Sequence, residues 1–400
     1  MAAAMRLQRL TLANFRNFRQ LEVEFPAGAI IVVGDNAQGK SNLLEAIHYL
    51  TGGVPAHASQ DRELIHFDAW ALSRPFARAV GEIETRDQDL HIEIRIVMDP
   101  THANSRRLRK EILINGQKRR RRELTGRFSA VLFLPHDLEM VEGAPVNRRR
   151  FLDDMLSQAD PQYADDLIEY GKVLTQRNAL LRTLQERRGT PDQLAYWDER
   201  LCELAASLIR RRAHALLELD RLGHALHGEL TRESERLRLI YKPRLAPNNH
   251  AGEATPPAGL DIAAADLSAS LRASLERHRR LEIQRGMTLI GPHRDDFQFL
   301  ANDVDLRLFG SRGQNRTATL SLKLAEVEWL HERLQEWPLL LLDEVLAELD
   351  LSRRQDLLSR LGAAPQVVLT ATDPAMFPDA FLAAATLWRI RAGVLSPFAT

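Results

Sequence analysis

The alternation of hydrophobic and polar positions predicts strands near the start of the chain. Residues 6–25 (RLQRLTLANFRNFRQLEVEF) alternate, break and alternate again, as a pair of short strands does. The continuous apolar run AIIVVG at residues 29–34 is typical of a buried strand, and NLLEAIHYL at residues 42–50 has helical spacing. Renewed alternation over residues 80–114 predicts further strands, with a turn at Asn115-Gly116.

From Pro161 to Leu239 the hydrophobic period becomes helical, with almost no strand signal. The Gly and Pro of RRGTPDQ, residues 187–193, predict that two helices fold back on each other there. At 1.5 Å per residue, arms of about 28 and 45 residues are roughly 40 to 65 Å long. Residues 242–261 read as a loop, and an amphipathic helix over residues 267–286 leads back to strand-like sequence. The two apolar stripes consist of Leu167, Tyr170, Leu174, Leu181 and Leu184, and of Leu194, Trp197, Leu201, Leu204 and Leu208.

The composition, 44% hydrophobic and 27% charged, is that of an ordinary soluble globular protein. The 400 residues suffice for two or three domains. Because basic and acidic residues each number 54, any basic surface must be local. The single cysteine, Cys202, excludes an internal disulfide and a zinc knuckle and suits a reducing compartment. The apolar runs are far shorter than the roughly 20 residues of a membrane span, so we expect a cytoplasmic protein.

The stretch between the buried strand and the first helix fits the phosphate-loop pattern G-x-x-x-x-G-K-[ST]. In this pattern backbone N–H groups receive the α and β phosphates, Lys40 reaches the β and γ phosphates, and the Ser41 hydroxyl joins the Mg²⁺ shell. The flanking strand and helix make the match specific, and ATP with Mg²⁺ is the expected ligand. The expected nucleotide-binding residues are Gly34, Asp35, Asn36, Ala37, Gln38, Gly39, Lys40 and Ser41.

A second candidate segment, PLLLLDEVLAELD at residues 338–350, is an apolar strand that ends in two carboxylates. Asp343 is placed to hold Mg²⁺, and Glu344 to act as general base on the water that attacks the γ-phosphate. Together with Lys40 they form the expected catalytic set. A glutamate at this position favours ATP hydrolysis over phosphate transfer to a small acceptor.

The segment LFGSRGQNRTATLSLKLAEVEWL predicts an amphipathic helix with a small hydroxyl and a glycine at its N-terminus. Such a helix end forms a second phosphate-binding surface. Because one molecule already has a complete cradle, this surface is expected to serve the nucleotide of another molecule, in a pair with twofold symmetry and two shared sites. The residues concerned are Ser311, Arg312, Gly313 and Gln314.

These motifs in this order resemble the ABC-type ATPase heads of the structural-maintenance-of-chromosomes family, and more narrowly the bacterial RecF family. The narrower resemblance rests on residues 6–25 with Arg16, on residues 133–156 and on residues 288–299, and it extends from about residue 7 to residue 390. It implies a P-loop α/β head with a mixed sheet and helices, interrupted by an all-helical lobe carrying a short antiparallel arm. The implied division is an N-terminal ATPase half at residues 1–130, the helical lobe at 131–287, and a C-terminal ATPase half at 288–400.

The resemblance also assigns further residues. It adds Arg16 to the nucleotide-binding set and makes Asp350 a dimer contact. Family cradles usually carry Gly where Ala37 stands and Thr where Ser41 stands; Ala restricts the turn, whereas Ser keeps the hydroxyl. Where many ABC ATPases have a γ-phosphate-sensing histidine, VVLTATDP offers Thr370, Thr372 and Asp373.

Residues 104–123 are the candidate DNA-binding segment, since they contain nine basic and two acidic residues. Such side chains bind phosphates with strong salt dependence and little sequence preference, although a solvated surface run is the alternative. Arg148, Arg149 and Arg150 either contact DNA or pair inside the protein with acids such as Asp153 and Asp154. The candidates are Arg106, Arg107, Arg109, Lys110, Lys118, Arg119, Arg120, Arg121 and Arg122.

The family resemblance implies an ATP-dependent homodimer that binds gapped DNA or single-strand/double-strand junctions. It further implies a weak, DNA-stimulated ATPase that works with RecR and RecO to load RecA, in recombinational repair, replication fork maintenance and the SOS response. The competing hypotheses are a P-loop kinase or GTPase, another ABC-type subunit such as that of a transporter, and a cohesin-like tether. The last needs much longer coiled coils than this chain has.

Overall fold

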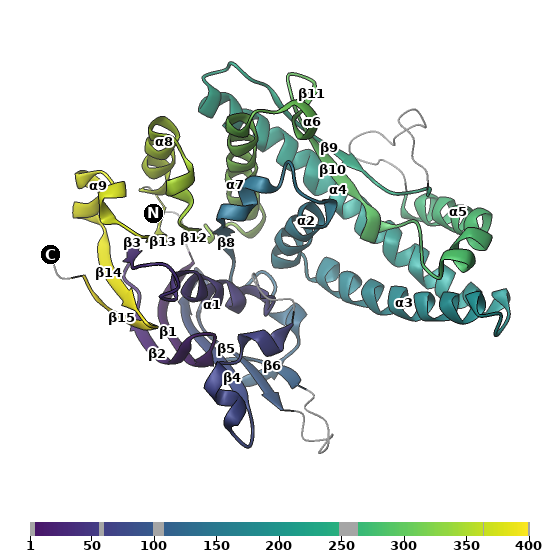
Figure 1. Ribbon diagram of the computed structural model, residues 1–400, viewed down its shortest axis with the longest axis horizontal. Helices are drawn as coiled ribbons and strands as arrows, with labels where there is room; N and C mark the ends of the chain where they lie inside the picture. Colours follow the sequence, from purple (N-terminus) through teal and green to yellow (C-terminus); the bar gives the residue numbers. More distant parts are fainter. Residues whose placement is uncertain (1–4, 56–59, 99–107, 248–262, 363, 399–400) are drawn as a thin grey trace. The chain divides into compact units, whose positions relative to one another are not determined.

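The computed structural model describes residues 5–55, 60–98, 108–247, 263–362 and 364–398 (Figure 1). It divides into two compact units: Met1–Asp137 with Glu326–Thr400, and Leu138–Ala325. The division expected from the sequence instead had domain boundaries after residues 130 and 287. Residues 288–325 fall in the helical unit because their strand pairs with a strand of that unit.

An antiparallel sheet of six strands forms one layer of the first unit, in the order β2-β1-β4-β5-β6-β7. The predicted strand pair at residues 6–25 and the turn at Asn115-Gly116 are confirmed, with φ values of 50° and 76° at the two turn residues. The strands are β1 (Arg6–Phe15), β2 (Phe18–Glu24), β4 (Phe76–Glu84), β5 (Asp89–Met98), β6 (Leu108–Ile114) and β7 (Gln117–Arg119).

A second six-stranded sheet has the order β15-β14-β3-β13-β12-β8, and all its pairs except β14–β15 are parallel. Parallel strands end at the same edge, so the segments following β3, β13 and β12 lie together. The strands are β3 (Gly28–Val33), β8 (Ala130–Phe133), β12 (Leu339–Asp343), β13 (Gln366–Ala371), β14 (Thr386–Arg391) and β15 (Val394–Pro397).

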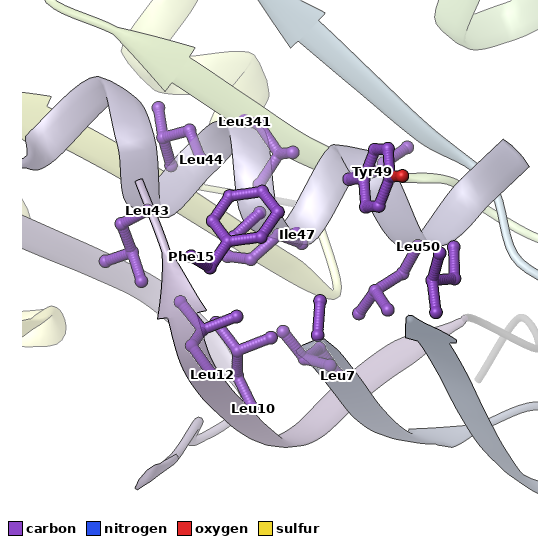
Figure 2. Close-up of a cluster of buried hydrophobic side chains, with 14 of the residues drawn as sticks. Leu7, Leu10, Leu12, Phe15, Leu43, Leu44, Ile47, Tyr49, Leu50 and Leu341 are labelled. Carbon is purple, nitrogen blue, oxygen red and sulfur yellow. The ribbon is translucent and has the colours of Figure 1, made fainter. Parts of the chain in front are cut away.

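Helix α1 (Lys40–Gly52) contacts strands of both sheets and joins them into one core. Figure 2 shows its Leu43, Ile47 and Leu50 gathered against side chains of β1 and Leu341 of β12. Each fully buried side chain of this kind contributes roughly 1.5–3 kcal/mol. The unit also contains α8 (Leu351–Leu361), α9 (Asp379–Ala384) and the short turns η1 (Asp61–Leu64), η2 (Phe67–Ala71), η3 (Arg121–Glu123), η7 (Val345–Glu348) and η8 (Pro374–Met376), while η4 (Pro135–Glu139) lies at the boundary.

The second unit is mainly helical and contains the predicted antiparallel arm. Helices α3 (Pro161–Gln185) and α4 (Ala195–Thr231) fold back at η5 (Pro191–Leu194), and their 25 and 37 residues make them slightly shorter than expected. Strand β9 (Leu237–Lys242) begins inside the stretch expected to be helical. Most of the loop expected at 242–261 lies outside the described residues. The remaining elements are α2 (Pro145–Ala159), α5 (Ala264–Arg285), η6 (Pro292–Arg294), β10 (Asp296–Ala301), β11 (Val304–Asp305), α6 (Leu306–Phe309) and the start of α7 (Arg312–Leu334).

A buried arginine joins the two helices of the arm to α5 near the fold-back. The Arg177 guanidinium of α3 lies 2.7 Å from Asp198 of α4 and 2.7 Å from Glu282 of α5, and Arg177 and Glu282 side chains are fully buried. It also donates to the Thr288 hydroxyl at 2.7 Å. A buried charge network of this kind holds its helices firmly because removing one member leaves the others uncompensated.

Replacing Arg177 with alanine should therefore destabilise the helical unit by about 3–5 kcal/mol, the usual effect of breaking a buried ion pair. Hydrogen exchange followed by mass spectrometry should show faster amide exchange in α3, α4 and α5. Arg188→Ala is the matched control, since the Arg188 side chain is 79% exposed. Amide exchange at the wild-type rate in the Arg177→Ala variant would contradict the role of Arg177 in holding these helices together.

Candidate functional site

The loop after β3 has the shape of a phosphate cradle because two of its glycines admit no side chain. A Cβ at Gly34 would lie 2.6 Å from the Ile390 carbonyl oxygen, and one at Gly39 would lie 2.4 Å from Asn17 Nδ2. Gly39 also has φ 115°, in the region that favours glycine. The loop therefore turns tightly into the N-terminus of α1, where backbone N–H groups remain available for anions.

Lys40, the first residue of α1, places its ammonium inside this turn. The residue is 4% exposed. Its Nζ donates to the carbonyl oxygens of Gly34 at 2.5 Å and Asp35 at 2.8 Å, and lies 2.9 Å from Glu344 Oε1. Cradle and carboxylate, about 300 residues apart in the chain, thus meet at the Lys40 ammonium.

The two carboxylates at the end of β12 are oriented by the neighbouring strand. The Thr370 hydroxyl of β13 donates to Asp343 Oδ1 at 2.8 Å and accepts from the Glu344 N–H at 3.0 Å. Asp343 is buried, whereas the Glu344 side chain is 31% exposed and its backbone has φ 51°. The sequence offered Thr370, Thr372 and Asp373 without assigning a γ-phosphate sensor among them; the structure places the Thr370 hydroxyl between the two carboxylate residues.

Lys40 and the two carboxylate residues line one cleft of about 340 Å³. Ser41 and Asp343 both line it, and their oxygen donors suit Mg²⁺, which takes few protein ligands beside phosphate and water. Within the described ranges no group of three or more His, Cys, Asp or Glu side chains is placed to hold a metal alone. The lining residues are Asn36, Ala37, Gly39, Lys40, Ser41, Asn42, Pro135, Asp343 and Glu344.

The loop is held from behind at Gln38, by Asn17 and by the β14–β15 turn, which the sequence did not single out. Gln38 accepts N–H groups of the β14–β15 turn, from Ala392 to its side chain at 2.7 Å and from Gly393 to its carbonyl at 3.0 Å. Asn17 Nδ2 donates to the same carbonyl at 3.2 Å, and Asn42 donates to Asn17 Oδ1 at 2.8 Å. In the sequence, Asn17 of NFRNF, residues 14–18, was the one polar side chain that could have indicated this support.

Arg16 lies in the turn between β1 and β2 and is held by an acid of α1. Its guanidinium meets both oxygens of Glu45, at 2.7 and 3.0 Å, and donates to the Glu63 carbonyl at 3.2 Å. Glu45 is fully buried. The pair fixes the direction of Arg16, which keeps 18% of its side chain exposed.

The second expected phosphate-binding surface lies in the helical unit, at the start of α7. Ser311 and Gln314 form a reciprocal cap: the Ser311 N–H donates to Gln314 Oε1 at 2.9 Å, and the Gln314 N–H donates to Ser311 Oγ at 3.2 Å. Ser311 and Arg312 are exposed, and Gly313 and Gln314 are half-buried.

Asp350 caps α8 in the ATPase unit. Its Oδ1 accepts the Arg353 N–H at 3.0 Å, and this hydrogen bond lowers the pKa of the Asp350 carboxyl. The following side chain, Leu351, is 72% exposed.

The candidate DNA-binding residues divide into two groups. Lys110 is turned inward, 2.9 Å from Asp61 and over the Tyr49 ring, and burial lowers the pKa of its ammonium. Arg121 is half-buried, and Arg106 and Arg107 lie outside the described residues. The exposed basic residues around β6, β7 and η3 are Arg109, Lys118, Arg119, Arg120 and Arg122. Glu111 and Glu123 offset part of their charge.

The arginines at residues 148–150 pair inside the protein, which is the second of the two alternatives that the sequence left open. Arg148 is 1% exposed, meets Asp296 at 2.6 Å and donates to the carbonyls of residues 140, 141 and 143. Arg149 donates to the Asp295 carbonyl at 2.7 Å, and Arg150 lies 3.8 Å from Asp154.

Four features define an ABC-type P-loop ATPase head: a phosphate cradle after β3, an Asp-Glu pair after β12, strand β13 between them, and a helical unit with its own capped helix start. The model of the RecF/RecN/SMC N terminal domain matches residues 6–392. The chain belongs to the RecF family of DNA replication and repair proteins.

Two relatives named DNA replication and repair protein RecF illustrate the match. The protein of Heliobacterium modesticaldum is 38% identical, covering 98% of this chain and 99% of its own. That of Herpetosiphon aurantiacus is 39% identical over 98% of this chain and all of its own. Two solved structures of the recombination mediator protein RecF in the RecFOR pathway, as RecF-ATP and RecF-ATPrS, each have a TM-score of 0.84 at 32% identity and cover all of this chain and 99% of theirs.

None of the helices in the described parts of the chain combines the length and apolar character needed to cross a membrane.

Ala37 has φ 63°, a conformation that glycine adopts freely and alanine does at a cost of about 1 kcal/mol. Ala37→Gly should therefore leave ATP affinity unchanged or tighten it a few-fold. Gly39→Ala is the opposite change in the same loop, and its Cβ clash should weaken binding by about tenfold or more. Titration with a fluorescent ATP analogue measures both, and weaker binding by Ala37→Gly would contradict the loop geometry.

Proposed function

We propose that this protein binds ATP with Mg²⁺ in the cleft and hydrolyses it slowly, with DNA stimulating the reaction. The observation that carries this proposal is the convergence of Lys40, Asp343 and Glu344 on one cleft at the edge of the parallel sheet. Lys40 neutralises the β and γ phosphates, and Glu344 accepts the proton of the attacking water. Bound Mg²⁺, held through Ser41 and Asp343, would neutralise charge on the phosphates. Arg16 and the cradle backbone complete the nucleotide-binding set.

The proposed reaction needs two copies. One copy supplies the cradle and the other supplies Ser311, Arg312, Gly313 and Gln314, with Asp350 as a dimer contact. The exposed, capped start of α7 supports this assignment, because a positive helix end with a free surface suits the γ-phosphate. ATP then joins two identical chains through two equivalent sites.

The proposed macromolecular ligand is DNA with a gap or a single-strand/double-strand junction. Arg109, Lys118, Arg119, Arg120 and Arg122 offer exposed charge for phosphate contacts, which give little sequence preference. Because the relatives are RecF proteins of replication and repair and the solved structures concern the RecFOR pathway, we assign the chain to that pathway. Its proposed role is to work with RecR and RecO in loading RecA in the bacterial cytoplasm, during recombinational repair, fork maintenance and the SOS response.

Two substitutions in the cleft should have opposite effects. Lys40→Ala removes the phosphate-binding charge and should abolish ATP-dependent dimerisation, whereas Glu344→Gln keeps binding but removes the base and should accumulate a long-lived ATP dimer on DNA. Light scattering with and without ATP, on gapped and ungapped DNA, measures dimerisation, and phosphate release measures turnover. A Lys40→Ala variant that dimerises normally would exclude the shared site, and fast turnover by Glu344→Gln would exclude Glu344 as the base.

The basic surface can be tested through salt dependence. Lys118 and Arg120 changed together to glutamine should weaken DNA binding and lower the slope of log K against log salt by up to about 2, one for each lost phosphate contact. Lys110→Gln is the matched control, since Lys110 pairs with Asp61 inside the protein. An unchanged slope in the double variant would place DNA elsewhere.

A further inference from the structure

The start of α7 is anchored by a chain of polar contacts to residues outside the Ser311–Gln314 segment. Gln314, the capping residue, donates its Nε2 to Glu235 Oε1 at 2.9 Å. Glu235 Oε2 lies 3.2 Å from His227 Nε2, and His227 Nδ1 lies 3.0 Å from Ser321 Oγ. The contacts return to α7 two turns beyond the cap and close a ring through the end of α4 and the turn before β9.

Ser321 ties this ring to α7 a second time. Its hydroxyl donates to the Thr317 carbonyl at 2.8 Å. The ring therefore contacts α7 at its cap and again two turns later.

Burial and paired contacts keep this anchor in place. His227 is fully buried and the Glu235 side chain is 20% exposed. Both carboxylate oxygens of Glu235 have polar partners, Gln314 Nε2 and His227 Nε2. The anchor can thus hold Gln314, and through it the Ser311 cap, in a fixed direction.

We propose that Glu235, supported by His227, is a positioning residue for the Ser311–Gln314 surface and acts on the nucleotide held by the partner copy. This inference rests on the proposed function. Without the carboxylate, Gln314 can turn away from the helix cap, and the surface loses its fixed direction. Neither Glu235 nor His227 contacts the nucleotide.

Glu235→Ala should reduce ATP hydrolysis by about tenfold or more, the effect of losing a hydrogen bond to a charged group. Glu235→Gln should keep most of the activity, because its amide oxygen can accept from Gln314 while its amide N–H donates to His227. Glu233→Ala is the matched control, an exposed acid of the same turn, and should behave as wild type. Wild-type turnover by Glu235→Ala, or an equal loss in Glu235→Gln, would overturn the proposal.

The decisive experiment mixes two poorly active variants before ATP is added. In a mixed dimer of Glu235→Ala and Glu344→Gln, one site combines both defects and the other combines two intact halves. In a single round of hydrolysis, which the ATP trapped at the Glu344→Gln site does not limit, the ADP formed should rise to about a quarter of the wild-type amount, since about half of the dimers are mixed and each has one working site of two. A defect of Glu235→Ala in its own cradle, or in folding, gives no such rise and would overturn the proposal.

A parallel mixture of Ser311→Arg with Glu344→Gln separates this inference from the function on which it rests. If this mixture recovers turnover and the Glu235→Ala mixture does not, the positioning role is wrong and the shared site stands. If neither mixture recovers, the shared site itself is wrong, and the positioning role fails with it.

Discussion

The architecture of the cleft depends on the compensation of one buried positive charge. The Lys40 ammonium is almost completely removed from water, and burying such a group costs several kcal/mol unless acceptors surround it. Two carbonyls of its own loop and the Glu344 carboxylate supply them. For these acceptors to meet, the cradle and the end of β12 must share one edge of the parallel sheet. The strand order β3-β13-β12 brings them there.

The same constraint explains what surrounds the cleft. Strand β13 lies between the two halves and contributes Thr370, whose hydroxyl joins Asp343 to the Glu344 backbone. The β14–β15 turn and Asn17 fix the carbonyl and side chain of Gln38, so the loop cannot drift from Lys40. Helix α1 starts at Lys40 itself and carries this local order into the hydrophobic core.

Local patterns predicted the parts of the site that chain neighbours determine. The cradle, the Asp343-Glu344 strand end, the capped start of α7 and the fold-back arm all have signatures within one short segment, and the structure places them in the predicted elements. The supporting contacts were not predicted, because Asn17 and Ala392 acquire their roles, and Gln38 and Thr370 their partners, only when distant segments meet. Charge alone also failed to separate Lys110 from Lys118, since alternation on a strand decides which faces inward.

In the proposed dimer, ATP is shared between the cradle of one copy and the α7 start of another. Cysteines introduced singly at Asn36 and Arg312, both exposed, test it by cross-linking a mixture of the two variants with a short bifunctional maleimide. Cys202 should not interfere, because it is buried and burial raises the pKa of its thiol to about 12. We expect a cross-linked dimer that forms in the mixture only when ATP is present. Bound ATP without that cross-link, or equal cross-linking without ATP, would contradict it.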